Sequence, residues 1–290
     1  MNNKGLTISL VFEAESANYG EGFGNITSLK KLTRGDGKVY SYISRQALRY
    51  NIIQQLGWDN TPTVPSGSGE KTVIQFTPEA TIKDYPEIDL FGYMKTEAKK
   101  GAATRSAVVR LSNAISLESY NSDLDFLTNM GLAQRTGSNN SIAQSEIHKS
   151  YYTYTITVDL DKVGIDGDIE ISNQDKKDRI VDLLKTIRFL YRDIRGRREN
   201  LSPVFIIGGV YTRKNPFFEN RIRVNKNKLD VNILADVINS DELIKENTVI
   251  GYIENTFSNN EEIKSLNAQN ISEFFETIIK NIEVFFNESN

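Results

Sequence analysis

Ten residues at positions 151–160, YYTYTITVDL, constrain the fold more than any other stretch of this chain. Successive side chains of a strand point to opposite faces of a sheet, so the alternation predicts a β-strand with two different faces. One face would carry large apolar groups: Tyr152, Tyr154, Ile156, Val158 and Leu160. The other would carry mostly polar groups: Tyr151, Thr153, Thr155, Thr157 and Asp159.

Local signals predict the elements around this strand. Two more strands are expected, at 6–16 and 203–211. Apolar spacing and capping residues predict three helices: 44–57 with Ser44 as N-cap and Gly57 as its end, 175–194, and 270–286 capped by Asn270 and Glu273. This order fits a βαββαβ sheet with helices on one face, as in ferredoxin-like and RNA-recognition folds. The predicted fold class is therefore α+β.

The middle of the chain lacks long helical patterns. Residues 59–72 are rich in Pro, Gly and Ser, which predicts a flexible connection. Short strands and loops are expected from there to about residue 150, with 104–119 as the best strand candidate. The polar stretch 131–150 has too few large apolar residues to order itself, so it is expected to be a mobile protrusion, with a hairpin as one possible form.

The charge of the chain is distributed unevenly. The net charge is −3, from 35 Lys and Arg against 38 Asp and Glu. Most of the positive charge nevertheless lies in four stretches with few acids: 27–50, 95–110, 185–198 and 213–228. From Leu229 onward, most of the charged residues are acidic. A polyanion could therefore bind one surface despite the overall sign, although four unrelated solvated faces would give the same counts.

Two groups of side chains, most of them cations, stand in positions that suggest phosphate contact. Arg45, Gln46 and Arg49 lie on the first turns of the predicted helix, where the helix dipole favours anions and cations are mildly unfavourable. In DIRGRREN (193–200), three arginines surround Gly196 just past a predicted helix end. That group suits either phosphate contact or a charged helix C-cap, and the sequence leaves both open.

Sequence motifs argue against catalysis. GEGFGN has Asn25 where a dinucleotide fingerprint needs its third glycine, and no phosphate loop, HExxH or GxSxG occurs. The only histidine, His148, lies in the polar stretch and is expected to be a surface residue rather than a general base. No catalytic residue, metal site or cofactor is therefore predicted.

The compartment is predicted from what the sequence lacks. There is no cysteine, which excludes disulfides and thiolate metal sites. No apolar run is long enough to span a membrane, and the start MNNKGLTISLVF lacks the features of a signal peptide. A cytoplasmic protein without a membrane partner is expected.

Several stretches together resemble one family. They are NYGEGFGNITSLKKLT, YISRQALRYNI, ATRSAVVRLSNAISLESYNSDLDFLTN, YYTYTITVDLDKVG and TIRFLYRDIRGRRENLSPVFIIGG, in order from residue 18 to about 209. The chain resembles the DevR-type branch of the CRISPR-associated Cascade backbone proteins, in the RAMP superfamily and subtype I-B. No motif match extends beyond about residue 225.

The resemblance implies a modified RNA-recognition-type palm with inserted finger and thumb-like elements. Residues 1–57 and 151–290 would form the palm, and 58–150 the inserted region. It implies a non-catalytic subunit that polymerises along CRISPR RNA in a type I-B Cascade complex. Its partners would be CRISPR RNA, the target DNA strand paired to it, copies of itself in a helical filament, and other Cascade subunits. Together with the basic stretches, it predicts RNA contacts at Lys30, Lys31, Ser44, Arg45, Gln46, Arg49, Arg105, Arg110, Arg195, Arg197 and Arg198.

Two other functions stay open at this point. An endoribonuclease that processes CRISPR RNA shares the predicted fold, so fold alone does not decide against it. Asp36 in RGDG is the acid that could serve an RNA-cleaving loop. A transcriptional autoregulator is the second alternative, although no helix-turn-helix pattern is visible.

Overall fold

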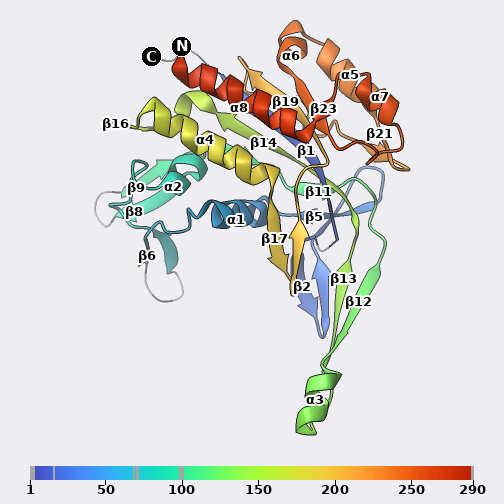
Figure 1. The fold of residues 1–290 in the computed structure, drawn as a ribbon. Helices are drawn as coiled ribbons and strands as arrows, with labels where there is room; N and C mark the ends of the chain where they lie inside the picture. Colours follow the sequence, from blue (N-terminus) through green and yellow to red (C-terminus); the bar gives the residue numbers. More distant parts are fainter. Residues whose placement is uncertain (1–3, 16, 68, 70–71, 98–100, 289–290) are drawn as a thin grey trace.

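The computed structural model describes residues 4–15, 17–67, 69, 72–97 and 101–288 of the chain, which form a mixed α+β fold (Figure 1). Within these residues, nine strands make one large sheet in the order β23-β22-β19-β1-β14-β11-β5-β4, with β10 also paired to β14. Their bounds are β1 Gly5–Ala14, β4 Lys31–Thr33, β5 Val39–Ile43, β10 Val109–Leu111, β11 Ala114–Ser116, β14 Ser150–Asp159, β19 Phe205–Tyr211, β22 Val249–Tyr252 and β23 Gln269–Asn270.

The centre of the sheet is the antiparallel trio of β19, β1 and β14. Ile8 of β1 lies opposite Ile156 on one side and Gly208 on the other. Gly208 has φ 153, and a Cβ there would lie 2.1 Å from the carbonyl oxygen of Thr7, so only glycine lets the two strands approach. The strands predicted at 6–16, 151–160 and 203–211 are confirmed.

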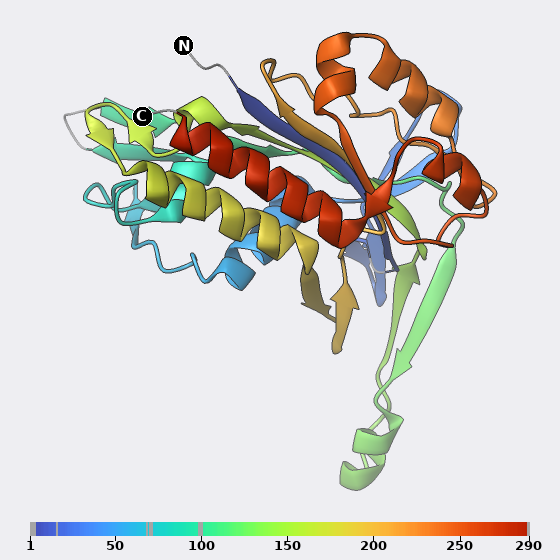
Figure 2. The same ribbon diagram turned by 45° about the horizontal axis from the view of Figure 1, so that its top comes forward.

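Three helices cover one face of the sheet (Figures 1 and 2). They are α1 (Arg45–Leu56), α4 (Asn173–Arg188) and α8 (Ile271–Asn287). Apolar side chains of β1 and β14 join theirs in one core that includes Ile8, Tyr154, Ile156, Ile180 and Phe274. Each fully buried side chain of this size stabilises the fold by about 1.5–3 kcal/mol.

The predicted caps form as expected. The Ser44 hydroxyl accepts from the N–H of Ala47, and Gly57 ends α1 in the left-handed conformation at φ 67. Asn270 and Glu273 form the reciprocal capping box of α8. These local signals therefore predicted both ends of α1 and the N-terminus of α8 correctly.

The helix predicted at 175–194 is too long at its C-terminal end. Helix α4 ends at Arg188, and the chain then forms a hairpin of β17 (Tyr191–Ile194) and β18 (Arg197–Asn200). Arg195 at φ 49 and Gly196 at φ 76 make its turn. The charged C-cap interpretation of DIRGRREN is therefore wrong. The strand predicted at 104–119 is broken into three short ones: β9 (Gly101–Arg105), β10 and β11.

A smaller sheet carries a long projection. Four described strands pair in the order β12-β13-β3-β2, and the bounds are β2 Tyr19–Phe23, β3 Ile26–Leu29, β12 Asp123–Thr128 and β13 Ile142–Ile147. Strands β12 and β13 continue into helix α3 (Met130–Thr136) at the far tip (Figure 1). We call residues 123–147 the arm. The stretch predicted as a protrusion is a paired hairpin with a helical tip, and it begins eight residues earlier than predicted.

The remaining elements form two groups at the ends of the large sheet. One end carries α2 (Pro86–Phe91), η2 (Leu160–Lys162) and the strands β6 Thr63–Ser66, β7 Val73–Phe76, β8 Tyr93–Glu97, β9 Gly101–Arg105, β15 Ile165–Asp166 and β16 Ile169–Glu170. The other is a C-terminal lobe of α5 (Val231–Asn239), α6 (Glu242–Asn247), α7 (Asn260–Lys264), β20 (Val224–Asn225) and β21 (Lys228–Leu229).

The lobe covers only part of the second sheet face. Its Leu234, Ile244 and Phe257 pack on Val11 and Phe205 in a separate core, which leaves the rest of that face uncovered by helices. The division into palm and insertion at residues 57 and 150 stays a prediction. Strands β10 and β11 come from the predicted insertion and nevertheless pair within the large sheet.

Candidate nucleic-acid interface

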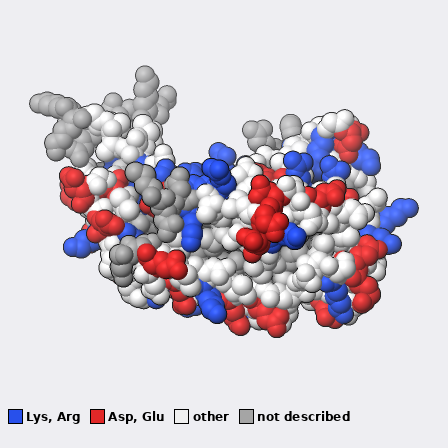
Figure 3. Space-filling view, turned by 90° about the horizontal axis from the view of Figure 1, so that it is seen from above, with Lys and Arg blue, Asp and Glu red and all other residues white. Residues whose placement is uncertain are grey.

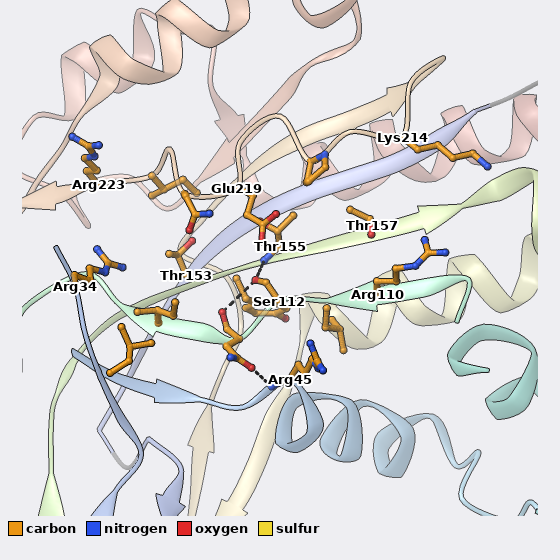
Figure 4. Close-up of a pocket in the computed structure, with 18 of the residues that line it drawn as sticks. Arg34, Arg45, Arg110, Ser112, Thr153, Thr155, Thr157, Lys214, Glu219 and Arg223 are labelled. Atoms are coloured by element: carbon orange, nitrogen blue, oxygen red, sulfur yellow. Dashed lines mark hydrogen bonds between the residues drawn. The ribbon is translucent and has the colours of Figure 1, made fainter. Parts of the chain in front are cut away.

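A cleft of about 990 Å³ lies on the sheet face opposite α1, α4 and α8 (Figure 4). We call it the sheet cleft. Strand β14 forms its floor, because alternation turns Thr153, Thr155 and Thr157 into the cleft while Tyr154 and Ile156 enter the core. Ser112, between β10 and β11, also lines the floor. The polar face predicted for this strand is therefore the base of a cavity.

The floor is held in place by hydrogen bonds between neighbouring strands. The hydroxyls of Ser9 and Thr155 lie 2.6 Å apart across β1 and β14. The hydroxyl of Ser112 accepts from the backbone N–H of Thr155 at 2.9 Å. The floor is thus an uncharged surface of hydroxyl groups, most of which stand on strand β14.

Positive side chains surround this floor. Of the described residues that line the sheet cleft, five are cations and one is an acid, Glu219; the cations are Arg34, Arg45, Arg110, Lys214 and Arg223. They come from different elements and lie around the floor in Figure 4. By contrast, the face in Figure 3 mixes blue and red groups, so the positive charge is not gathered there.

The five cations differ in how strongly acids neutralise them. Arg110 pairs with Asp159 at 3.0 Å, and Lys214 pairs with Asp161. Arg34 instead lies over the ring of Tyr40, 4.3 Å from its centroid. For the side chains of Arg45 and Arg223, both exposed, the described part of the chain gives no acidic partner within 4 Å. An anion in the cleft would therefore meet cations that are still available.

The start of α1 borders the cleft, but its backbone is already bonded. The N–H of Arg45 donates to the side-chain oxygen of Asn113 at 2.9 Å, and the N–H of Ala47 donates to Ser44. Ser44 itself is only 8% exposed and donates to Asn18. An anion can therefore meet the side chains of Arg45 and exposed Gln46, but not these two N–H groups or the Ser44 hydroxyl.

Arg49 lies one turn further along α1 and lines a different cleft. Its guanidinium is 3.9 Å from Glu87 and lies over the ring of Phe91, 5.0 Å from the centroid. Burial lowers the pKa of Arg49 from its usual value. The structure thus separates Arg45 from Arg49, which the sequence had suggested as one phosphate site.

Arg105 is a structural residue rather than a surface cation. It donates to the carboxylate of Asp89 at 2.6 Å, and Arg179 binds the other oxygen of the same carboxylate at 2.7 Å. The side chain of Arg105 is only 7% exposed, and that of Asp89 is not exposed at all. RNA could contact Arg105 only if this buried guanidinium gave up its bonds to the protein. The structure therefore contradicts the RNA contact predicted for Arg105.

The predicted lysines lie beside the arm rather than in the cleft. Lys31 pairs with Glu146 at 2.7 Å and lies over the ring of Tyr120, 4.6 Å from its centroid. Lys30 is half-buried, and its backbone N–H donates to Asn18. Lys31 therefore joins β4 to the root of the arm at β13.

The three arginines of the β17–β18 hairpin form a second basic group. Arg198 pairs with Asp193 at 2.9 Å, and Arg197 pairs with Glu15 and Glu199 at 3.2 and 2.8 Å. Arg195 lies over the ring of Tyr19, 4.1 Å from its centroid. Acids balance much of this charge, and the three arginines do not line the sheet cleft.

The only histidine is buried, contrary to expectation. His148 is 6% exposed, and its Nδ1 lies 2.8 Å from the hydroxyl of Ser41. The ring of Tyr120 packs edge-on against it. Burial lowers the pKa of His148, which keeps its ring neutral at pH 7. The prediction that His148 lies on the surface is wrong, because the polar stretch 131–150 returns to the large sheet at its C-terminal end, where β14 begins.

Sequence reasoning missed several residues that define the cleft: Arg34, Lys214, Arg223, Ser112 and the three threonines. The sequence contains the signals for these residues in separate segments. Arg34, Lys214 and Arg223 belong to two of the basic stretches, and the threonines are the polar face of the alternating strand. Only the sheet order brings these groups together.

The described part of the chain has no group of three or more His, Cys, Asp or Glu side chains arranged to hold a metal ion. None of its helices is both long and apolar enough to cross a membrane.

Comparison with known proteins identifies the family. Two chains of solved structures share the fold: one from a "CRISPR RNA-guided surveillance complex, pre-nicking" (TM-score 0.62, 11% identity, 96% of this chain and 100% of that one), and one from a "CRISPR RNA-guided surveillance complex" (0.58, 14%, 96% and 99%). The "CRISPR-associated protein Cas7/Cst2/DevR" of Myxococcus xanthus (strain DK1622) is 29% identical over an alignment of 153 residues. The match covers 47% of this chain and 50% of that protein.

The chain thus matches about half the length of this relative. The chain also matches a protein family over residues 6–233, which include the sheet cleft. That family is described as "CRISPR-associated negative auto-regulator DevR/Csa2". Because the match covers most of the chain and agrees with the fold, this protein belongs to the CRISPR-associated DevR/Csa2 family.

Proposed function

We propose that this protein is a non-catalytic subunit that holds CRISPR RNA by its phosphate backbone in the sheet cleft. The observation that carries the proposal is the cleft itself, in which five cations and one acid surround an uncharged floor. Arginine binds phosphate with charge-assisted hydrogen bonds, which are about twice as strong as neutral ones. Backbone contacts carry no sequence information, which suits a protein whose guide must remain free to pair.

The large sheet supports an RNA-recognition-type palm. Strands β19, β1, β14 and β10 are neighbours in that order, and α1 and α4 cover the face opposite the cleft. This neighbour order supports the proposed βαββαβ palm. RNA-recognition domains stack bases on aromatic side chains of the open face. Here the corresponding face of β14 presents threonines, so the palm would bind backbone rather than bases.

The partners are inferred from the family and from the similar folds. We propose that copies of this chain assemble on CRISPR RNA as a helical filament in a type I-B Cascade complex, with other Cascade subunits and the paired target DNA strand. A filament multiplies weak contacts, because each added subunit binds at a high effective concentration. The arm projects away from the large sheet (Figure 1), and six of its apolar side chains are exposed: Leu124, Phe126, Leu127, Met130, Leu132 and Ile142.

The absence of catalysis is part of the proposal. A general acid or base must come within about 3 Å of the proton it transfers. His148 is enclosed by Ser41, Tyr120 and Tyr152, so it cannot reach RNA in the cleft. Asp36 accepts from the backbone of Lys38 and from the hydroxyl of Tyr40, and these bonds hold its pKa below the usual value. That environment favours a turn-stabilising carboxylate.

The salt dependence of binding tests the proposal. Two unrelated RNAs of equal length are titrated at several salt concentrations. The proteins are wild type, the double variant Arg34→Ala/Arg223→Ala, and the control Lys185→Ala, which removes an exposed cation of α4. Each phosphate neutralised adds about −0.7 to the slope of log affinity against log salt. The double variant should therefore reduce the slope by about 1.4 for both RNAs. A flat salt response, or strong preference for one RNA, contradicts backbone binding.

A further inference from the structure

The sheet cleft keeps charged and uncharged polar groups apart, as a nucleotide does with its phosphate and its sugar. Its rim holds the cations, whereas its floor holds uncharged hydroxyl groups from Ser112, Thr153, Thr155 and Thr157. A phosphate oxygen accepts hydrogen bonds only, and the rim arginines offer it charged donors. A hydroxyl both donates and accepts. The floor therefore suits a ligand group with the same double character.

Two of the four floor hydroxyls have bonding capacity to spare. Thr155 is engaged with Ser9, and Ser112 accepts from one backbone group while donating to the carbonyl of Asn113. Thr153 and Thr157 are only half-buried, and the described part of the chain gives their hydroxyls no hydrogen-bond partner. They lie four residues apart on β14, which separates them by about 13 Å along the strand. Figure 4 shows both in the cleft.

Bases are poor candidates for contact with this floor. Proteins bind unpaired bases mainly by stacking them on aromatic rings. Tyr154 is the one aromatic residue among the described residues that line the cleft, and its side chain is 2% exposed on the opposite face of β14. With phosphates attracted to the rim and no ring available for bases, the sugar is the part of the nucleotide left for the floor.

We infer that Thr153 and Thr157 recognise ribose 2′-hydroxyl groups and make the sheet cleft select RNA over single-stranded DNA. This inference rests on the proposed function. The 2′-hydroxyl is the group by which a protein distinguishes RNA from DNA at a given site. The two threonines are specificity-determining residues: they add preference for the sugar, while the cations provide most of the affinity.

The test compares three single strands of one sequence: RNA, DNA, and RNA with fluorine in place of each 2′-hydroxyl. Fluorine removes the hydrogen-bond donor but keeps the sugar conformation of RNA. The proteins are wild type, Thr153→Val/Thr157→Val, and the control Thr186→Val on α4. Two lost neutral hydrogen bonds should weaken RNA binding by the double variant about tenfold. Its DNA binding should stay within about twofold of wild type, and circular dichroism should show an unchanged fold.

The outcomes separate this inference from the proposed function. Wild type should bind RNA more tightly than DNA and should bind the fluorinated strand like DNA. If the fluorinated strand binds like RNA, sugar conformation is what matters and the hydroxyl contact is overturned. If the double variant keeps the wild-type preference, the threonines do not read the sugar, although RNA binding stands. If wild type binds neither RNA nor DNA, the proposed function fails and this inference fails with it.

Discussion

Replacing Asp89 with asparagine should destabilise the protein more than any surface charge change. Asp89 is fully buried and binds Arg105 at 2.6 Å, Arg179 at 2.7 Å and the N–H of Gly164 at 3.0 Å. Asparagine has the same shape, so no cavity forms. It removes the only carboxylate that the described residues place between the two guanidinium groups. Breaking a buried ion pair by removing one partner costs about 3–5 kcal/mol.

The size of the thermal shift follows from the length of the chain. The unfolding entropy near the midpoint is about 2.1 cal/mol/K per residue, or roughly 0.6 kcal/mol/K for this chain. The variant should therefore lower Tm by about 5–8 °C. Thermal unfolding followed by circular dichroism measures it. Asp193→Asn is the matched control, because its pair with Arg198 is exposed and should leave Tm unchanged. Equal small shifts in both variants would refute the structural role of the Asp89 cluster.

Three further predictions concern single residues. Arg45→Ala should weaken RNA binding about tenfold, and Arg49→Ala should leave it unchanged, in the same titration. Burial lowers the pKa of His148 in the folded state. The neutral ring therefore contributes stability above the unfolded-state pKa of about 6.5, and this contribution is lost as the pH falls below that value. Denaturant unfolding at pH 7.5 and 5.5 should show a smaller loss for His148→Gln than for wild type. Trypsin should cut the free protein first at exposed Arg135 in the arm, and RNA should protect it.

Each of these predictions has a contradicting result. Equal effects of the two arginine variants would mean that α1 presents one continuous phosphate site after all. Parallel losses of stability in wild type and His148→Gln would show that carboxylates alone set the acid response. Cleavage at Arg135 at the same rate with and without RNA would mean that the arm is only a surface hairpin, with no role in assembly.

Elements with local signals were predictable from the sequence. The alternation of β14, the caps Ser44 and Gly57 of α1, and the capping box of α8 each depend on residues close together in the chain. The predicted C-terminal end of α4 was wrong for a local reason. Tyr191 and Ile194 continue the helical spacing, yet their side chains belong to a hairpin whose partner strand supplies the backbone bonds. Periodicity alone cannot show which pairing prevails.

The site was less predictable because its contacts are distant in the sequence. The partner of Arg105 is 16 residues away, and the second arginine on the same carboxylate is 90 residues from it. His148 meets Ser41 across 107 residues. A basic residue in a basic stretch therefore gives no sign of whether it will be buried against an acid or stand at a cleft. Arg105 and Arg223 differ in just this way.

The position of the RNA on the protein is the central claim, and photo-crosslinking tests it most directly. RNA that carries an aryl azide, attached through one backbone phosphorothioate at a time, is bound to the full chain, irradiated, digested and analysed by mass spectrometry. The account predicts cross-linked peptides from 34–45, 110–113, 153–157 and 214–223, and their loss in Arg34→Ala/Arg223→Ala. Cross-links concentrated on α4 and α8, with none from these four segments, would contradict it.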